Sequence, residues 1–310
     1  MPLEKRSPDV SVVVPTVGRP ELVQALKSAR EQVGVSVEVI VVFDLQADSS
    51  NARVSDGLAD LVLYTGGGRR ANVARNMGTR AASGRYVAFL DDDDFWAPGK
   101  LAGQVAVAGE IEALGRHALV STRFGQLDVS TGHRFGGLPS RVYDGSITPE
   151  EYLFVRRRPG AGRATLPVPT LLVSRELACK VPWREDLRRH QDWDWLVRAC
   201  AEPGTQLVQM EDDLVTVRVG SAGSISATAD WASSLEWAVE ALGAKPHVLV
   251  DFLAGQPLRY ALQARSPQGV RRTVREMLRT ARRPTVPSLL VGLSGLLTRT
   301  MLQQVMRRVR

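Results

Sequence analysis

The chain contains 310 residues, of which 40 are Lys or Arg and 33 are Asp or Glu, so its formal net charge is +7. Its apolar fraction of 44% and charged fraction of 24% are ordinary for a globular protein, which excludes wholesale disorder and a fibrous chain. A chain of this length forms one large domain or two small ones, and either arrangement can bury a full core.

The positive charge is concentrated in the C-terminal tail. Residues 259–310 contain twelve Arg, no Lys, one Glu and no Asp, a net charge of +11, and the remaining residues together carry −4. Because the body of the chain is slightly acidic, nucleic acid is not the first choice of partner for the whole protein.

The cysteines and the N-terminus bear on the cellular compartment. Cys179 and Cys200 are too few for a disulfide framework, and we expect both to be small buried hydrophobic residues. The first nine residues lack the apolar core of a signal peptide, and no stretch reaches about 18 uninterrupted apolar residues. We therefore expect a cytoplasmic protein, with peripheral binding to the inner face of the plasma membrane left open.

Strands and helices alternate in the first half of the chain. The β-branched run Ser11–Pro15 and the run Glu38–Asp44 predict buried strands, and helical spacing follows the first of them. In chain order, strands are predicted at 11–15, 38–44, 61–65 and 86–91, and helices at 21–32, 72–83 and 98–114. This order predicts a mainly parallel central sheet covered by helices, an α/β fold.

The pattern changes after about residue 117. Strands are predicted at 118–124, 170–174 and 207–219, a turn at 131–137, a helix at 192–201 and a helical region from residue 231. Two amphipathic helices are predicted in the tail, one over 268–283 and a second apolar stripe over 289–305. Pro284 and Pro287 separate them.

Four consecutive carboxylates follow the strand predicted at 86–91. Asp91-Asp92-Asp93-Asp94 stands between Phe89-Leu90 and Phe95-Trp96, and ligands of an open α/β sheet bind beyond the carboxyl ends of its strands. Clustered carboxylates repel one another unless a cation compensates, and Mg²⁺ or Mn²⁺ takes oxygen ligands and bridges to phosphates. The position favours a metal–phosphate site over an exposed acidic turn or a helix cap.

Two further segments have a nucleotide-binding interpretation and a structural alternative. Gly66-Gly67-Gly68 precedes a helix, so its backbone can approach an anion closely, and a plain turn is equally compatible. Arg75 and Asn76 lie about one turn inside that helix. Asp44 closes the second strand and can accept a hydrogen bond from a ribose or base, or cap a helix.

An acid pair opens the helix predicted at 192–201. Asp192 and Asp194 stand beside Trp193 and Trp195, and an Asp near apolar rings can have a raised pKa and act as a base. The alternative is an acid at the helix N-terminus with both tryptophans in the core. Two steps along a helix turn about 200°, so both acids cannot face one site.

The order and spacing of these segments are more specific than any one of them. The segments are Pro15-Thr16-Val17-Gly18-Arg19, Asp44, Ala74-Arg75-Asn76-x-Gly78, the Phe89 to Trp96 run with Pro98 and Leu101, and Gln191-Asp192. Together they resemble the family 2 glycosyltransferases, which have the GT-A (nucleotide-diphospho-sugar transferase) fold. The resemblance covers about residues 9–222.

The resemblance implies a domain organisation. Residues 9–222 would form the GT-A catalytic domain, with a nucleotide-sugar-binding half over 9–116 and an acceptor-binding half over 117–222. Residues 223–310 would form a helical, Arg-rich C-terminal extension.

The resemblance also implies roles for individual residues. The nucleotide sugar would be bound by Pro15, Val17, Asp44, Arg75, Asp91 and Asp92. Asp91 and Asp93 match the outer residues of the family's DxD motif and would hold Mn²⁺ or Mg²⁺. Asp192 matches the Asp that serves as general base, with Gln191 where Glu is more common, and Asp194 is the alternative base.

The implied activity is that of an inverting, metal-dependent hexosyltransferase. A UDP- or dTDP-sugar would be the donor, and a hydroxyl of a saccharide or another molecule would be the acceptor. A sugar-phosphate nucleotidyltransferase is an alternative, but it would have a Gly-rich, Lys-containing loop where this chain has PTVGRP. A non-catalytic protein that binds membrane or nucleic acid through its tail has no need for Asp91, Asp93 and Asp192 together.

Two interpretations of the basic tail remain open at this point. Amphipathic helices flanked by Arg suit an anionic membrane surface, where each basic residue contributes about 1 kcal/mol. Alternatively, both apolar stripes pack on the catalytic domain or on a second subunit.

Overall fold

The computed structural model describes residues 7–47, 55, 57–158, 164–220 and 229–297. These residues belong to two compact units. The first comprises Met1–Ser146, Thr165–Leu187 and Gln191–Ser221, and the second comprises Ile147–Ala164, Arg188–His190 and Ala222–Arg310. Residues 147–164 and 188–190 thus group with the C-terminal helices, while the domain limits implied by the family resemblance stay predictions.

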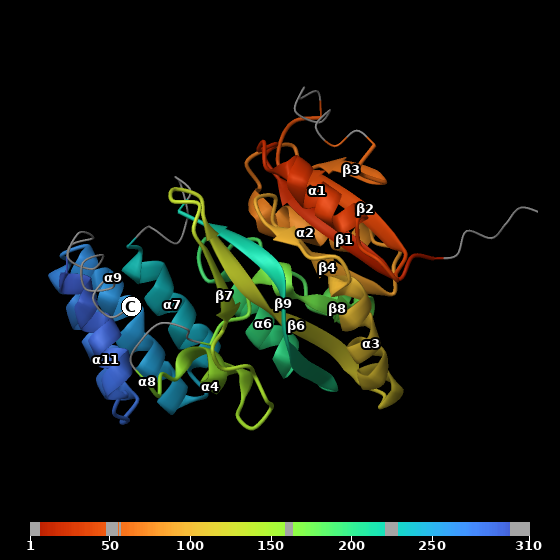
Figure 1. Cartoon of the computed structure of the whole chain (residues 1–310). Helices are drawn as coiled ribbons and strands as arrows, with labels where there is room; N and C mark the ends of the chain where they lie inside the picture. The colour runs from red at the N-terminus through yellow and green to blue at the C-terminus, as the bar shows by residue number, and fades with distance from the viewer. Residues whose placement is uncertain (1–6, 48–54, 56, 159–163, 221–228, 298–310) are drawn as a thin grey trace, which may run out of the picture. The chain divides into compact units, whose positions relative to one another are not determined.

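The first unit is built on one mixed sheet, whose strands run from red to turquoise in Figure 1. Its described strands are β1 (Val10–Thr16), β2 (Val37–Phe43), β3 (Leu61–Tyr64), β4 (Tyr86–Phe89), β5 (Phe95–Trp96), β6 (His117–Asp128), β7 (Arg134–Leu138), β8 (Leu172–Ser174) and β9 (Thr205–Val219). The strand order is β3-β2-β1-β4-β8-β6-β9-β5, and β7 pairs with β6.

The sheet has a parallel part and a mixed part. Strands β3, β2, β1 and β4 are all parallel, as the alternation of strands and helices predicts. Strand β8 is antiparallel to both β4 and β6, and β9 runs parallel to β6. Because β1, β2 and β4 are parallel neighbours, their carboxyl ends meet at one edge of the sheet.

Six described helices of the first unit accompany the sheet: α1 (Leu22–Arg30), α2 (Arg70–Ala81), α3 (Lys100–Ala113), η2 (Val168–Thr170), α5 (Arg175–Lys180) and α6 (Gln191–Ala201). The side chains of β1 are buried along its whole length, because helices cover it. Gly78 lets α2 approach β1 closely, since a Cβ there would lie 2.4 Å from Cγ1 of Val13.

The second unit is helical among its described residues and is drawn largely in teal and blue in Figure 1. Its helices are α4 (Pro149–Phe154), α7 (Trp231–Leu242), α8 (Pro246–Gly255), α9 (Pro257–Gln263), α10 (Pro267–Arg279), α11 (Val286–Leu293) and η4 (Ser294–Leu296). Phe154 packs edge-on against Trp237 and Phe252, with ring centroids 5.9 and 5.1 Å apart. None of the described helices is both long and apolar enough to cross a bilayer.

Three local predictions are corrected by the structure. The segment predicted as a turn over 131–137 instead enters β7 at Arg134. Cys179 is exposed and Cys200 is half-buried, so the expectation of two buried cysteines is wrong, although no disulfide joins them. The tail stripe ends, within the described residues, at Leu297, and its predicted continuation over 298–305 lies outside them.

Candidate functional site

The candidate site lies at the carboxyl ends of β1, β2 and β4. Thr16 ends β1, Asp44 follows β2, and Asp91 comes two residues after β4. Pro15 is buried within β1, whereas the side chain of Val17, just beyond the strand, is exposed. Three of the segments named from the sequence are therefore gathered at one edge of the sheet, where ligands of open α/β sheets bind.

Two of the four consecutive carboxylates are used inside the protein. Asp92 is buried and accepts a hydrogen bond of 2.7 Å from the Thr16 hydroxyl. Asp94 is buried and accepts a hydrogen bond of 2.8 Å from the backbone N–H of Arg218 on β9. These bonds hold the acidic segment against β1 and β9, and binding of the nucleotide sugar by Asp92 stays a prediction.

The other two carboxylates are more accessible. The side chain of Asp91 is 34% exposed and that of Asp93 is 25% exposed. Asp93 pairs with Arg19 through an Nη1–Oδ2 distance of 3.1 Å. The alternation of inward and accessible acids separates Asp91 and Asp93, the two DxD positions of the resemblance, from their neighbours.

The charge of Asp91 contributes to raising the pKa values of the carboxylates that follow it. For Asp93, burial and then the charge of Asp91 raise the pKa, and Arg19 opposes them. For Asp94, burial and then Asp91 raise the pKa well above its usual range. Excess negative charge of this kind attracts a cation.

The acidic segment offers an incomplete set of metal ligands. No group of three or more His, Cys, Asp or Glu side chains is arranged to hold a metal among the described residues. Mg²⁺, however, is commonly held by one or two carboxylates together with substrate phosphates and water. Two accessible carboxylates with oxygen donors only, Asp91 and Asp93, fit this incomplete type of site.

Arg75 is a buried cation with unused hydrogen-bond donors. It lies on α2, is 4% exposed, and donates from Nη2 to Oδ1 of Asp91 at 2.7 Å. Its Nε and Nη1 are buried without a hydrogen-bond partner. Its Cζ lies 4.8 Å from the ring centroid of Trp183. Unsatisfied guanidinium donors are costly, and an anion such as a phosphate would satisfy them.

Trp183 is a residue that the sequence analysis missed. Its ring stacks on that of Trp195 with a centroid distance of 4.9 Å and an interplanar angle of 10°. Asn76 holds its backbone at both ends, donating to the Trp183 carbonyl and accepting from the Trp183 N–H, each at 2.8 Å. Trp183 thereby links Arg75 to α6. Its only signal in the sequence is an isolated Trp after Val181-Pro182, which carries no ligand chemistry.

The structure distinguishes between the two acids of α6. The helix begins at Gln191, so Asp192 and Asp194 face different directions. Asp194 is 2% exposed and accepts a hydrogen bond of 2.8 Å from Nε of Arg198, while Arg184 lies 3.7 Å away. The side chain of Asp192 is instead accessible. Asp194 is therefore occupied in ion pairs, which favours Asp192 for chemistry with a substrate.

Asp192 interacts electrostatically with the other site residues. Desolvation by the surrounding protein atoms raises its pKa, the charge of Arg75 lowers it, and the charge of Asp91 raises it further. Arg75 and Asp91 thus lie close enough for their charges to act on Asp192. Charges on α2, after β4 and on α6 therefore influence one another, and the roles that the resemblance implies for these residues stay predictions.

Asp44 has the hydrogen bonds of a helix-capping acid. It accepts bonds from the Thr65 hydroxyl and from the backbone N–H groups of Arg69 (2.8 Å) and Arg70 (2.7 Å). Burial raises its pKa, but these hydrogen bonds outweigh burial and lower the pKa overall. Each carboxylate oxygen has two acceptor sites, so contact with a nucleotide stays a prediction for Asp44.

The sequence was compared with known families and proteins. Residues 11–136 match the family described as "Glycosyl transferase family 2". The chain is 28% identical over 277 residues to the amylovoran biosynthesis glycosyltransferase AmsB of Erwinia amylovora, covering 83% of this chain and 86% of that protein.

Two further relatives match over shorter spans. The succinoglycan biosynthesis protein ExoO of Rhizobium meliloti is 39% identical over 104 residues, 32% of this chain and 30% of that protein. The UDP-Glc:alpha-D-GlcNAc-diphosphoundecaprenol beta-1,3-glucosyltransferase WfgD of Escherichia coli is 33% identical over 104 residues, 32% of this chain and 40% of that protein.

Solved structures share the fold. TarS of S. aureus in complex with UDP-GlcNAc superposes with a TM-score of 0.64 at 16% identity, covering 88% of this chain and 82% of that one. The mannosyltransferase PcManGT of Pyrobaculum calidifontis, in complex with GDP-Man and Mn²⁺, has a TM-score of 0.51 at 18% identity, covering 98% and 85%.

The sheet, its covering helices and these superpositions define the fold as that of the GT-A class of glycosyltransferases, with a helical C-terminal region. Residues 11–136 match glycosyltransferase family 2, and together with the similarity to AmsB this match supports a transferase enzyme.

Proposed function

We propose that this glycosyltransferase transfers a hexose from a nucleoside-diphosphate sugar to a saccharide hydroxyl, with inversion at C1. The observation that carries the proposal is that Arg75 and Asp91 form an ion pair and that the charges of both act on Asp192. A cation with unused donors, an accessible carboxylate and an accessible acid of raised pKa are the groups that this reaction requires.

Asp192 is the proposed general base. It accepts the proton of the acceptor hydroxyl as that oxygen attacks C1 from the face opposite the diphosphate. The new C1–O bond forms while the bond from C1 to the diphosphate oxygen breaks, and the diphosphate leaves with the electron pair. Attack from the opposite face inverts C1, as in inverting glycoside chemistry. The raised pKa of Asp192 brings the base closer to neutral pH, which favours proton transfer.

Arg75 is the proposed partner of the leaving diphosphate. Its ion pair with Asp91 and its contact with Trp183 fix the guanidinium in one orientation. The buried Nε and Nη1 then provide two donors that need not reorganise as charge develops on the phosphate oxygens.

Asp91 and Asp93 are the proposed holders of Mg²⁺ or Mn²⁺. Their oxygen-only donor set fits such an ion, which when bound supplies positive charge against the diphosphate. The complex of PcManGT with GDP-Man and Mn²⁺ supports metal use in the same fold. We expect EDTA to abolish transfer and Mn²⁺ or Mg²⁺ to restore it.

For the donor and acceptor, we propose a UDP-sugar, with a dTDP-sugar as second choice, and a growing polysaccharide. The TarS complex with UDP-GlcNAc and the UDP-Glc named for the Escherichia coli relative support the donor. The names of the amylovoran and succinoglycan proteins support a role in polysaccharide biosynthesis. The diphosphoundecaprenol substrate of the Escherichia coli enzyme suggests a lipid-linked acceptor.

A binding screen followed by a turnover assay tests this proposal. We expect UDP to raise the melting temperature more than GDP does, and only in the presence of Mn²⁺. Release of UDP from a panel of UDP-sugars then identifies the donor. If no nucleoside diphosphate is released from any common nucleotide sugar, and Asp93→Ala changes nothing, the proposed reaction is wrong.

A further inference from the structure

Helices α10 and α11 pack on the helical unit through their smallest residues. In α10 the buried residues are Gly269 and Thr273, and a Cβ on Gly269 would lie 2.7 Å from the Trp231 ring. In α11 the buried residues are Ser288 and Gly292, and a Cβ on Gly292 would lie 2.1 Å from a backbone oxygen of α8. The inward faces of both helices therefore depend on the absence of large side chains.

Several large apolar side chains of the same helices are exposed. Leu278 of α10 is 75% exposed, and Val286, Leu290 and Leu293 of α11 are 68%, 52% and 49% exposed. The positions 286, 290 and 293 share one face of a helix. A surface helix in water has the opposite arrangement, with its large apolar residues against the core. Small residues at helix contacts and large apolar ones outside are typical of helices whose outer face meets lipid.

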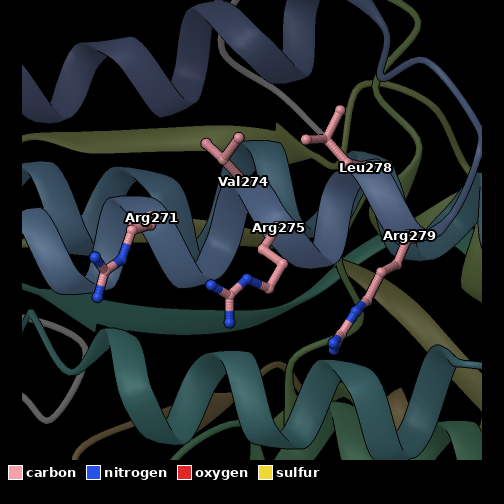
Figure 2. A pocket seen from close by; sticks show the side chains of 5 residues that line it. All are labelled: Arg271, Val274, Arg275, Leu278 and Arg279. Atoms are coloured by element: carbon pink, nitrogen blue, oxygen red, sulfur yellow. The ribbon is translucent and has the colours of Figure 1, made fainter.

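The same segment of the chain is strongly basic. Residues 267–297 contain six Arg and one Glu, and that Glu, Glu276, pairs with Arg279 at 2.7 Å. Arg271, Arg275 and Arg279 line one shallow pocket together with Val274 and Leu278. Figure 2 shows the three Arg side chains pointing to one side of α10 and the two apolar side chains to the other.

Together these features indicate which kind of partner binds the exposed surface of these helices. Exposed leucines require a partner that accepts hydrocarbon, and a row of Arg requires negative charge. The interface of a bilayer with anionic headgroups supplies both, and helices with one basic and one apolar side bind in its plane.

We propose that α10, α11 and η4 form a docking surface for an anionic phospholipid bilayer. The apolar side chains of α11 and η4 enter the headgroup–acyl boundary, and the Arg row of α10 contacts lipid phosphates. This surface is independent of the proposed transferase site, so each can fail without the other.

Vesicle flotation of the purified full-length protein tests the proposal. The probe is a vesicle of phosphatidylcholine with about one third phosphatidylglycerol, at about 0.05 M salt, where charges are weakly screened. We expect the protein to float with these vesicles, and to remain in solution with pure phosphatidylcholine or at about 0.5 M salt. Failure to float with the anionic vesicles at low salt overturns the proposal.

Two variants separate the apolar and the basic contributions. Leu290→Gln with Leu293→Gln is expected to weaken vesicle binding at least about tenfold, because two half-exposed leucines no longer enter the interface. Changing Arg271, Arg275 and Arg279 together to Gln is expected to weaken vesicle binding about a hundredfold, or about fivefold for each charge removed. Both sets of side chains are exposed, so we expect neither change to unfold the protein.

The matched controls make the same kinds of substitution, apolar to Gln and Arg to Gln, elsewhere on the surface. Val33 and Leu114 are exposed apolar residues of the first unit, and their double change to Gln is expected to leave flotation as in wild type. A second control changes three exposed arginines of the first unit to Gln: Arg80, Arg116 and Arg175. It removes the same amount of charge and is expected to reduce vesicle binding less than threefold. A control that weakens binding as much as its test variant refutes the assignment to α10 and α11.

Two other occupants predict different results. If a second copy covers the surface, Leu290→Gln with Leu293→Gln halves the mass measured by sedimentation without changing flotation, which overturns the proposal. If the chain's final segment is the binder, Leu302→Gln with Val305→Gln abolishes flotation while the α11 variant floats normally, which overturns it too. Release of UDP without vesicles, measured on the same variants, is expected to stay at the wild-type rate.

Discussion

Substitution of Arg75 separates its charge from its hydrogen-bonding shape. Arg75→Lys keeps a positive charge near Asp91 and Asp192 but loses the two guanidinium donors, Nε and Nη1, that lack a protein partner. Arg75→Gln removes the charge as well. The two variants therefore predict different patterns of rate and pH dependence.

The magnitude follows from the number of bonds lost. A hydrogen bond to a charged group contributes about 1.5–3 kcal/mol, so losing two bonds to the leaving phosphate costs at least about 3 kcal/mol in the transition state. This corresponds to about a hundredfold lower kcat for Arg75→Lys. Arg75→Gln also loses the charge that faces the developing anion, and we expect kcat to fall about a thousandfold.

The pH dependence gives a second readout. Deprotonated Asp192 is required, so the rate falls as the pH drops through its pKa. Arg75 lowers that pKa against the effect of burial, so Arg75→Gln is expected to move the acid limb to higher pH. Arg75→Lys keeps the charge and should leave the limb in place. If Arg75 had a purely structural role, neither substitution would shift the acid limb of the pH profile.

The assay is release of UDP from the donor, measured across pH, with melting temperature as a check on folding. Arg85→Lys is the matched control, because Arg85 also pairs with a carboxylate, Glu112, and also lies over a ring, that of Tyr86 at 5.3 Å. Arg85 directly precedes β4, so it lies at the opposite end of that strand from Asp91. Wild-type kcat in Arg75→Lys, or an unmoved acid limb in Arg75→Gln, would refute the proposed role.

Three further substitutions test the packing around the site. Trp183→Leu is expected to lower kcat about tenfold, whereas Trp183→Phe should retain most of the wild-type kcat because it keeps a ring under the Arg75 guanidinium. Equal kcat values for the two variants would contradict this role of the Trp183 ring. Asp194→Asn is expected to lower the free energy of unfolding by about 2 kcal/mol in urea titration, with kcat within about threefold, because it breaks ion pairs of a buried carboxylate. Gly78→Ala is expected to destabilise by about 1–3 kcal/mol because its Cβ meets Val13, whereas Gly109→Ala, with open space, should stabilise α3; similar effects would show that close approach is irrelevant.

The sequence predicted the parallel part of the sheet because its inner strands are buried on both faces. Such strands are continuous runs of β-branched residues, as in Val10–Thr16 and Val37–Phe43, and their ends place the site. The acidic run, Arg75 and Asp192 were found because charged residues follow or start well-patterned elements. Whether these residues lie near one another depends on long-range packing. Only the family resemblance gave a reason to group them in one site.

Short and irregular elements were missed for identifiable reasons. Strand β5 has two residues and follows the acidic run, and β7 contains two glycines that indicate a turn. Helix α4 had a usable signal, since Thr148 and Glu151 form a capping box with Pro149 at the helix start.

The inward and outward faces of the tail helices were not predictable from hydrophobic periodicity. The apolar stripe of 268–283 left open whether Val274 and Leu278 pack inward or face a membrane; both are exposed, and Gly269 and Thr273 are buried. Periodicity locates an apolar face but does not say what covers it.

The most direct test of the central claim measures donor binding and transfer on the same preparation of Asp192→Asn. Asn keeps the shape of the side chain but cannot accept the acceptor's proton. We expect binding of the UDP-sugar with Mn²⁺ to stay within about threefold of wild type, and transfer to fall at least about a thousandfold. Asp212→Asn, a change at an exposed acid on β9, should preserve both. Transfer by Asp192→Asn within about tenfold of the wild-type rate would contradict the account.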